Sequence, residues 1–151
     1  MWNQITDFVN DHQLKHMNHV EHIGIAVKDL SASIPLFEKL LKSTCYKTES
    51  VATEQVDTAF FKTGETKIEL LQSTTNDGVI AKFIEKKGEG LHHIAFDVTD
   101  IREEMNRLKQ AGFTLLSEEP KQGADNKLVC FLHPKTTNGI LIEICQEKKV
   151  Q

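Results

Sequence analysis

The pattern of apolar and polar positions predicts a strand and then a helix after the first 18 residues. Apolar residues alternate along VEHIGIAV (20–27), as expected for a β-strand with one buried face. Asp29 and Ser31 follow this strand and can cap the start of a helix. Apolar side chains then recur at helical spacing: Ile34, Phe37, Leu40 and Leu41.

The remaining elements follow the same order in each half of the chain. Three strands are predicted after the first helix, near residues 45–50, 56–63 and 66–72. A short helix then ends at Gly88. The second half begins with the strand LHHIAFDV, followed by a helix that Asp100 can cap. Three more strands are predicted near residues 113–117, 127–132 and 139–146. Each half therefore has the order strand–helix–strand–strand–strand.

The N-terminal segment differs from both halves. Its apolar residues lie at helical spacing: Trp2, Ile5, Phe8 and Val9. We therefore predict an N-terminal helical arm over residues 1–18. Because no linker rich in Pro, Gly or Ser separates the halves, residues 19–151 are predicted to form one domain of two modules, about 19–88 and 89–147.

An offset of 71 residues superimposes the two halves. HIGIAVKDL, which begins at His22, then lies over HIAFDVTDI, which begins at His93. In this register Glu21 matches His92. Because successive strand side chains point to opposite faces, His92 is expected to face away from the side that His93 serves. His93 is therefore the candidate functional histidine of the pair.

A glutamate occupies the middle of the last strand in each half. Glu69 lies within KIELLQ, and Glu143 lies within LIEICQ, each between aliphatic residues. An ionised carboxylate in such a place costs several kcal/mol unless it is paired or bound to metal. A lone strand histidine or glutamate is usually structural or solvated. Two histidines and two glutamates at equivalent places of a repeat instead predict one metal site.

Composition and charge exclude several classes of function. The net charge is −4 and no block of basic residues occurs, which argues against binding to nucleic acid or to an anionic membrane. No apolar run is long enough to cross a membrane. The three cysteines are an odd number at no metal-like spacing: Cys45, Cys130 and Cys145. Together with the lack of a recognisable signal peptide, they predict a cytoplasmic protein.

Several stretches resemble a known family. They are HIGIAVKDL, TKIELLQ, GLHHIAFDV, LSEEPKQGADN and FLHPKTTNGILIEICQ, in that order from about residue 20 to 147. They resemble the vicinal oxygen chelate superfamily, which includes glyoxalases and bleomycin resistance proteins, and most closely its methylmalonyl-CoA epimerase family. The resemblance implies an α+β fold in which paired βαβββ modules form a curved, metal-holding half-barrel.

The resemblance also implies the site. Four residues are expected to bind one divalent metal ion, for which Co, Mn, Ni and Zn are all suitable: His22, Glu69, His93 and Glu143. Small residues beside the histidines would leave room for a ligand: Gly24, Ala26 and Ala95. The implied reaction is metal-dependent epimerisation of methylmalonyl-CoA at C2 through an enolate, with Glu143 as one acid/base.

The second acid/base is left open by the sequence. Some family members carry a glutamate for this role where this chain has Thr58. Asp57 lies beside it but is expected to face away from the site, and Glu54 lies just upstream. Either the register slips, or another group, such as metal-bound water, supplies the second proton.

The expected partners also come from the resemblance. The expected substrate is a coenzyme A thioester, and Lys121 and Lys135 are candidates to bind its phosphates. A homodimer is also expected, and the N-terminal arm could contribute to its interface. The other histidines are interpreted as structural or non-functional: His12, His16, His19 and His133.

Two alternatives use the same fold. A glyoxalase I (lactoylglutathione lyase) type isomerase would use a similar His/Glu metal set on a glutathione hemithioacetal. A metal-free small-molecule binding protein typically lacks the full set of four ligands. A ring-cleaving dioxygenase would use iron with two histidines and one carboxylate, so Glu69 argues against it.

Overall fold

The computed structural model describes residues 17–149, so the predicted helical arm lies outside the described residues except for its last two positions. The first module contains β1 (Val20–Ala26), α1 (Leu30–Leu41), β2 (Lys47–Val51), the 3-10 helix η1 (Ala52–Glu54), β3 (Val56–Thr63), β4 (Thr66–Ser73) and α2 (Val79–Lys87). The second contains β5 (Gly90–Asp97), α3 (Ile101–Gln110), β6 (Lys121–Gln122), β7 (Lys127–Leu132), the 3-10 helix η2 (Pro134–Thr136) and β8 (Ile142–Glu147).

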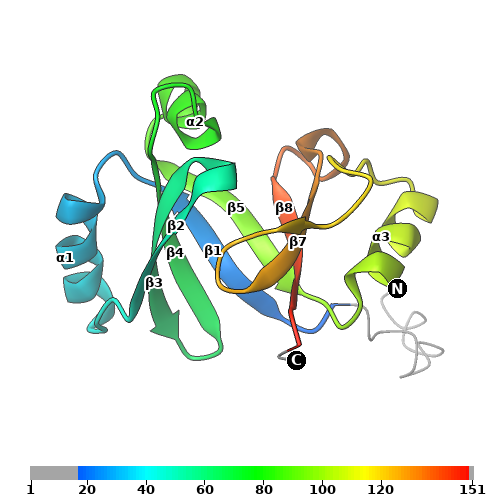
Figure 1. Cartoon of the computed structure of the whole chain (residues 1–151), viewed down its shortest axis with the longest axis horizontal. Coiled ribbons are helices and arrows are strands. Elements are labelled where there is room, and N and C mark those ends of the chain that lie inside the picture. Colours follow the sequence, from blue (N-terminus) through cyan, green and yellow to red (C-terminus); the bar gives the residue numbers. More distant parts are fainter. Residues whose placement is uncertain (1–16, 150–151) are drawn as a thin grey trace, which may run out of the picture.

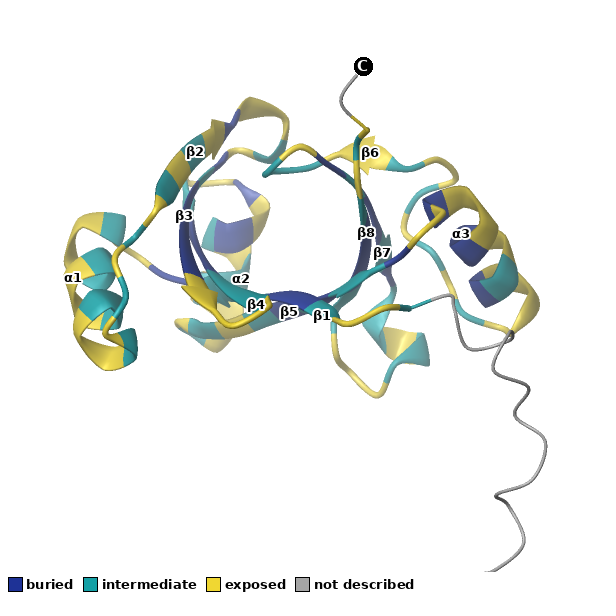
Figure 2. Cartoon of the chain, turned by 90° about the horizontal axis from the view of Figure 1, so that it is seen from below, coloured by how far each residue is buried: buried dark blue, intermediate teal, exposed yellow. Residues whose placement is uncertain are grey.

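One eight-stranded sheet runs through both modules, in the order β2-β3-β4-β1-β5-β8-β7-β6. The first strands of the modules, β1 and β5, pair antiparallel at its centre. Each then pairs in parallel with the last strand of its own module, β4 or β8. The sheet curls so that its two edges face each other across an opening (Figures 1 and 2). The predicted half-barrel of paired modules is therefore confirmed.

The two long helices lie on the outside of this curl (Figure 2) and begin as predicted. The Asp29 carboxylate accepts a hydrogen bond of 2.9 Å from the Ser31 backbone N–H. The Asp100 carboxylate accepts two of 3.0 Å from the backbone N–H groups of Arg102 and Glu103. Both aspartates thus satisfy N–H groups that a helix start leaves free.

The predicted strand near residues 113–117 is wrong. That segment forms only an isolated bridge, Leu115 to Leu132, and the short edge strand β6 begins later, at Lys121. Two backbone hydrogen bonds flank this bridge, from Leu116 N–H to the Phe131 carbonyl at 2.8 Å and from His133 N–H to the Thr114 carbonyl at 2.7 Å. Pro120, which lacks an N–H, then separates this segment from β6.

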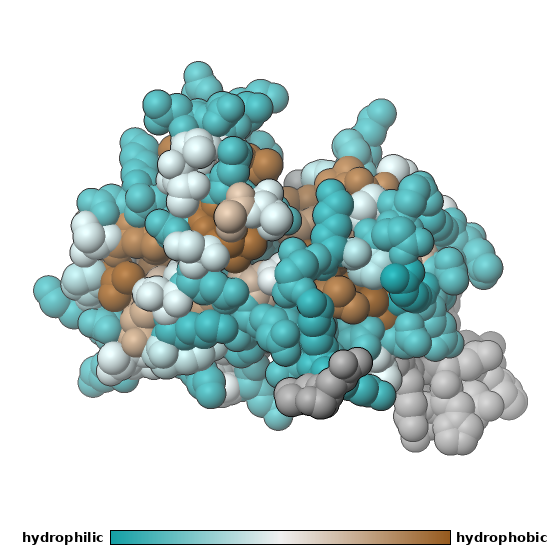
Figure 3. Space-filling view, in the orientation of Figure 1, coloured by the Kyte–Doolittle hydropathy of each residue, from teal (hydrophilic) through white to brown (hydrophobic). Residues whose placement is uncertain are grey.

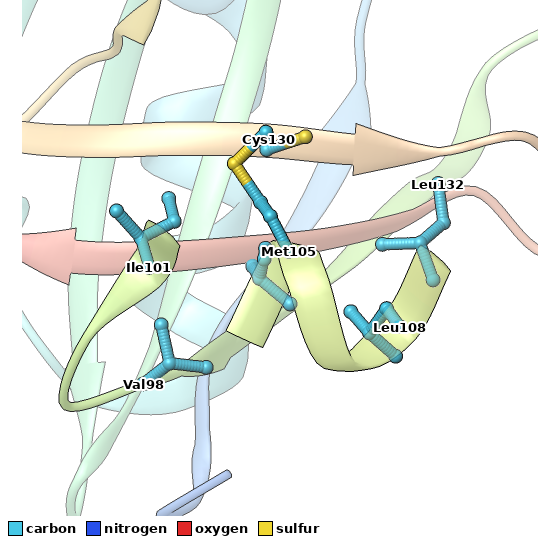
Figure 4. Close-up of a cluster of buried hydrophobic side chains, with 7 residues drawn as sticks. Val98, Ile101, Met105, Leu108, Cys130 and Leu132 are labelled. Atoms are coloured by element: carbon cyan, nitrogen blue, oxygen red, sulfur yellow. The ribbon is translucent and has the colours of Figure 1, made fainter. Parts of the chain in front are cut away.

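Each module has its own hydrophobic core between its long helix and the sheet. In the second module α3 packs a continuous apolar face against β7 and β8 (Figure 4). The buried residues of this cluster are Val98, Ile101, Met105, Leu108, Cys130, Leu132 and Ile144. In the first module, α1 has no fully buried residue, and its Leu36 and Leu40 are 61% and 69% exposed.

On the face shown in Figure 3, apolar surface is divided into patches bordered by hydrophilic side chains.

Candidate active site

The four predicted metal ligands lie on the four central strands of the sheet. His22 is on β1, Glu69 on β4, His93 on β5 and Glu143 on β8. Parallel pairing places Glu69 opposite Gly24 and Glu143 opposite Ala95. All four side chains point to the concave side, and each residue is no more than 6% exposed.

Their polar atoms converge on one point. The Nε2 atoms of His22 and His93 are 3.0 Å apart. A Glu69 carboxylate oxygen lies 3.2 Å from Nε2 of His22 and 3.5 Å from Nε2 of His93. Glu143 reaches the same two nitrogen atoms at 3.7 Å and 3.4 Å. The structure thus brings together all four residues that the repeat singled out.

This cluster forms one wall of a cavity of about 290 Å³. Apolar side chains of the first module also line the cavity: Val51, Val56, Leu71 and Ile80. Leu116, Ser117 and Lys121 line the cavity from the second module. Of the two lysines considered for coenzyme A, Lys121 therefore reaches the cavity, whereas Lys135 lies in η2 and is not part of its lining.

The residues preceding the two histidines also reach the site, and the sequence did not predict this. The β1–β5 register skips Glu21 in β1 and His92 in β5, so each strand carries a bulge at an equivalent place. A bulge sets two successive residues against one on the neighbouring strand, which interrupts the alternation of faces. Glu21 and His92 consequently line the same cavity as His22 and His93. The prediction that His92 faces away is therefore wrong.

Each bulge residue contacts Nδ1 of the histidine that follows it. The Glu21 carboxylate forms a short contact with Nδ1 of His22, and Nδ1 of His92 lies 2.9 Å from Nδ1 of His93. Phe131 packs edge-on against the His93 ring at a centroid distance of 5.6 Å. Both imidazoles are thus held with Nε2 toward the point of convergence.

The two central glutamates differ in protonation tendency. Burial raises the pKa of Glu143, and the charges of Glu69 and Glu21 act in the same direction, so the two histidines do not offset it. Burial also acts to raise the pKa of Glu69, but the hydrogen bond with His93 and the charges of both histidines hold it below its ordinary value. Glu143 is therefore the carboxylate of the pair that more readily takes up a proton.

Burial and neighbouring charges shift the pKa values of His22, Glu21 and His92 in different directions. Burial alone would lower the pKa of His22, but the hydrogen bond to Glu21 and the charges of Glu143 and Glu69 raise it to about 9. Burial likewise acts to raise the pKa of Glu21, but His22 and Lys67 hold it far below its ordinary value. Burial and the neighbouring His93 lower the pKa of His92 to about 4, so this ring is neutral at pH 7.

The donor set fits a divalent cation. Among residues 17–149, only His22 and His93 lie within ion-pair distance of the buried carboxylates of Glu69 and Glu143. Two imidazole nitrogens and two carboxylates form a mixed N/O set suited to Co, Mn, Ni or Zn. A positive ion among them would compensate charges that burial otherwise makes costly.

A second cluster of metal-ligating types shares His22 with the first. It consists of Glu21, His22 and Cys145. Burial and the charge of Glu143 raise the pKa of the Cys145 thiol, and its Sγ lies 3.5 Å from the Phe96 carbonyl oxygen. A neutral thiol with its own hydrogen-bond partner is a poor ligand, so this cluster does not compete with the first.

Gly24 makes room for the second histidine. It pairs with His93 across the β1–β5 ladder. A Cβ at this position would overlap the His93 ring. The space that this glycine leaves is therefore filled by the His93 ring, and not left for a bound ligand as expected.

Three residues were considered for the second acid/base. Thr58 lines the cavity, is 1% exposed, and its hydroxyl donates 3.1 Å to the Glu49 carbonyl oxygen. Asp57 accepts a hydrogen bond from Ser50 and is not part of the cavity lining, as alternation predicted. Glu54, in η1, does line the cavity.

The remaining predicted features are peripheral. His133 caps η2, since its Nδ1 accepts a 3.0 Å hydrogen bond from the Lys135 backbone N–H. His19 is exposed, whereas His12 and His16 lie outside the described residues. Cys45, Cys130 and Cys145 are free thiols. Among the described residues, no helix is long and apolar enough to cross a membrane.

Comparison with known proteins assigns the chain to a class of protein. A profile of the Glyoxalase/Bleomycin resistance protein/Dioxygenase superfamily matches residues 21–131. The chain therefore belongs to this superfamily, whose match covers β1 through β7.

Individual relatives show which members of the superfamily this chain resembles. The Ethylmalonyl-CoA/methylmalonyl-CoA epimerase of Cereibacter sphaeroides is 39% identical over 86% of this chain and 98% of its own. Uncharacterized protein YqjC of Bacillus subtilis is also 39% identical, over 87% of this chain and 94% of its own. The structure of Streptomyces coelicolor methylmalonyl-CoA epimerase in complex with 2-nitronate-propionyl-CoA matches with a TM-score of 0.83 and 29% identity, over 88% and 99% of the two chains. Within the superfamily, the chain thus groups with the epimerases.

Proposed function

We propose that the protein catalyses the metal-dependent epimerisation of methylmalonyl-CoA at C2 through an enolate. The observation that carries this proposal is the convergence of two histidines and two glutamates, from equivalent strands of two modules, on one buried point beside a cavity. The named relative from Cereibacter sphaeroides and the coenzyme A complex of the Streptomyces coelicolor protein support this substrate class.

Four side chains would hold the metal: His22, Glu69, His93 and Glu143. When bound, a divalent cation supplies a Lewis acid for the negative charge that develops on the thioester oxygen. The two imidazoles present Nε2 because their Nδ1 atoms are engaged elsewhere. Glu69, whose carboxylate oxygen lies 3.2 Å from Nε2 of His22, serves as a ligand that transfers no proton.

Glu143 would move one of the two protons. It lies on the cavity wall, where a carboxylate can take a proton from C2 of a bound substrate and return it. The apolar side chains that line the cavity, which include Val56, Leu71 and Ile80, would exclude water from the carbanion.

Glu54 is our candidate for the second proton, because of the three residues considered it alone combines a carboxylate with a place in the cavity lining. Replacing it, in Glu54→Gln, should slow proton loss from one C2 epimer far more than from the other. Asp57→Asn is the matched control, since Asp57 bonds Ser50 outside the cavity. Equal rates for both epimers in Glu54→Gln would remove Glu54 from this role.

Lys121, on the cavity lining, is proposed to bind a coenzyme A phosphate. Three further expectations stay predictions: phosphate binding by Lys135, the homodimer and the cytoplasmic location.

The decisive experiment follows the C2 proton of methylmalonyl-CoA in D₂O by proton NMR. Metal-loaded protein should replace this proton with deuterium rapidly, and chelator-treated protein should not. Restoring the activity with added Co²⁺ would show that the metal, and not damage by the chelator, makes the difference. Absence of exchange by folded, metal-loaded protein would overturn the proposal, and the glutathione hemithioacetal would then test the glyoxalase I alternative.

A further inference from the structure

Glu21 occupies a site that the reaction itself does not explain. It is a carboxylate in a bulge of β1 and is only 5% exposed. One of its oxygens contacts Nδ1 of His22. The other lies 2.5 Å from Lys67 Nζ and 3.6 Å from Lys127 Nζ. Both carboxylate oxygens are therefore engaged, and neither is directed at Nε2 of His22 where the four proposed ligands converge.

The contact with His22 determines which nitrogen of the ring carries the proton. A neutral imidazole has one N–H and one lone pair, and a carboxylate at Nδ1 keeps the N–H there. In the neutral ring that metal binding requires, Nε2 of His22 then carries the lone pair, 3.0 Å from Nε2 of His93. A carboxylate behind a metal-binding histidine also makes the ring a stronger donor.

Lys67 holds Glu21 in place from the other side. Its ammonium donates to Glu21 from β4 and, at 2.7 Å, to Asp125 in the turn between β6 and β7. The positioning unit is thus anchored to both modules. The positive charge of Lys67 also lowers the free-energy cost of burying Glu21 as an anion in a site that already contains two other carboxylates.

The equivalent place in the second module holds a neutral group. His92, in the bulge of β5, lies with Nδ1 2.9 Å from Nδ1 of His93, and Phe83 packs edge-on against its ring at 4.9 Å. This ring can accept the His93 N–H and orient it. It adds no negative charge, so its effect on donor strength is smaller.

We propose that Glu21, held by Lys67, is a positioning residue that fixes the tautomer and orientation of His22 and strengthens it as a metal ligand. This inference rests on the proposed metal site. In the second module, His92 provides the same orientation for His93 without the charge.

The test measures metal binding directly, without turnover. Chelator-treated full-length protein is titrated with Co²⁺, followed by calorimetry and by the visible absorption of the bound ion. Glu21→Gln keeps the size of the side chain and removes its charge, and is expected to bind Co²⁺ about 10–100-fold more weakly, with a shifted absorption spectrum. His92→Gln, the matched control at the equivalent bulge, should weaken binding by less than about tenfold.

A second variant covers the case in which Glu21→Gln does not fold. Lys67→Met leaves Glu21 in the chain but removes the group that holds it, and is expected to weaken Co²⁺ binding and broaden the absorption bands. Thermal unfolding of the metal-free variants separates stability from metal affinity. A lower Tm with unchanged Co²⁺ affinity and spectrum would assign Glu21 a purely structural role and overturn the inference.

The test of the Glu21 inference can fail independently of the test of the proposed function. Wild-type protein that binds Co²⁺ but does not exchange the C2 proton would overturn the epimerase proposal, while the Glu21 and His92 variants still decide the inference. Wild-type protein that binds no Co²⁺ would overturn both.

Discussion

The two modules share a backbone plan but differ in how they support the site. In both, a bulge before the histidine brings an extra side chain into the cavity. In the first module this side chain is the anion Glu21, and in the second it is the neutral ring of His92. The helices differ as well, since α3 buries four residues and α1 buries none. The repeated fold thus determines which backbone positions face the site, while the two modules differ in the charge and packing of the side chains at those positions.

The largest difference between the modules should appear in their equivalent glutamates. Glu143→Gln is expected to lower the rate of C2 proton exchange by about 10²–10⁴-fold, because the amide cannot take up the proton. Glu69→Gln keeps an oxygen donor at a position that transfers no proton, so its rate should fall much less. Exchange rates in D₂O at saturating metal measure both.

Metal content must be checked in the same samples. If both variants retain one Co²⁺ per chain, a difference in rate reflects proton transfer and not loss of the ion. Equal rates in the two variants would refute the assignment of different roles to the two glutamates.

The helices offer the next largest contrast. Leu108→Ala opens a cavity in the core beneath α3 and is expected to lower the free energy of unfolding by about 2–5 kcal/mol. Leu40→Ala on α1 removes a side chain that is 69% exposed, so a change within about 0.5 kcal/mol is expected. Urea denaturation of the metal-free proteins compares them, and a comparable loss in Leu40→Ala would mean that a partner covers this face in solution.

The smallest expected effect concerns the polar link between the modules. Asp125 receives hydrogen bonds from Lys67 and Lys47 of the first module, at 2.7 Å and 2.9 Å. Asp125→Asn removes the charge and suits the left-handed backbone there (φ +55°). Because Asp125 is 22% exposed, we expect a loss of about 1–2 kcal/mol in unfolding free energy.

Glu119→Gln is the control for this substitution. It removes the charge from an ion pair with Arg102 in which both side chains are more than half exposed, and no measurable change is expected. If Asp125→Asn is equally silent, the link between the modules contributes nothing to stability.

Features that repeat or act locally were predictable from the sequence. The caps at Asp29 and Asp100 depend only on neighbouring backbone N–H groups. The convergence of His22, Glu69, His93 and Glu143 was predictable because two copies of one pattern place these residues in register. In each case the information lies in a few adjacent residues or in a fixed offset.

Features that depend on pairing between distant strands were not predictable. The bulges are a property of the β1–β5 register, and strict alternation therefore misplaced His92 and overlooked Glu21. The correspondence of Glu21 with His92 across the repeat was the available signal. The Lys47–Asp125 contact joins residues 78 positions apart with no counterpart in the pattern.

The pairing of Gly24 with His93 has a consequence for mutational freedom. Its counterpart across the repeat, Ala95, pairs with His22 and carries a methyl group that Gly24 could not. In an assembly of two identical modules, any substitution would appear at both places, and one residue would have to suit both histidines. A single chain that contains both modules escapes that symmetry, so each histidine can have a neighbour of a different size.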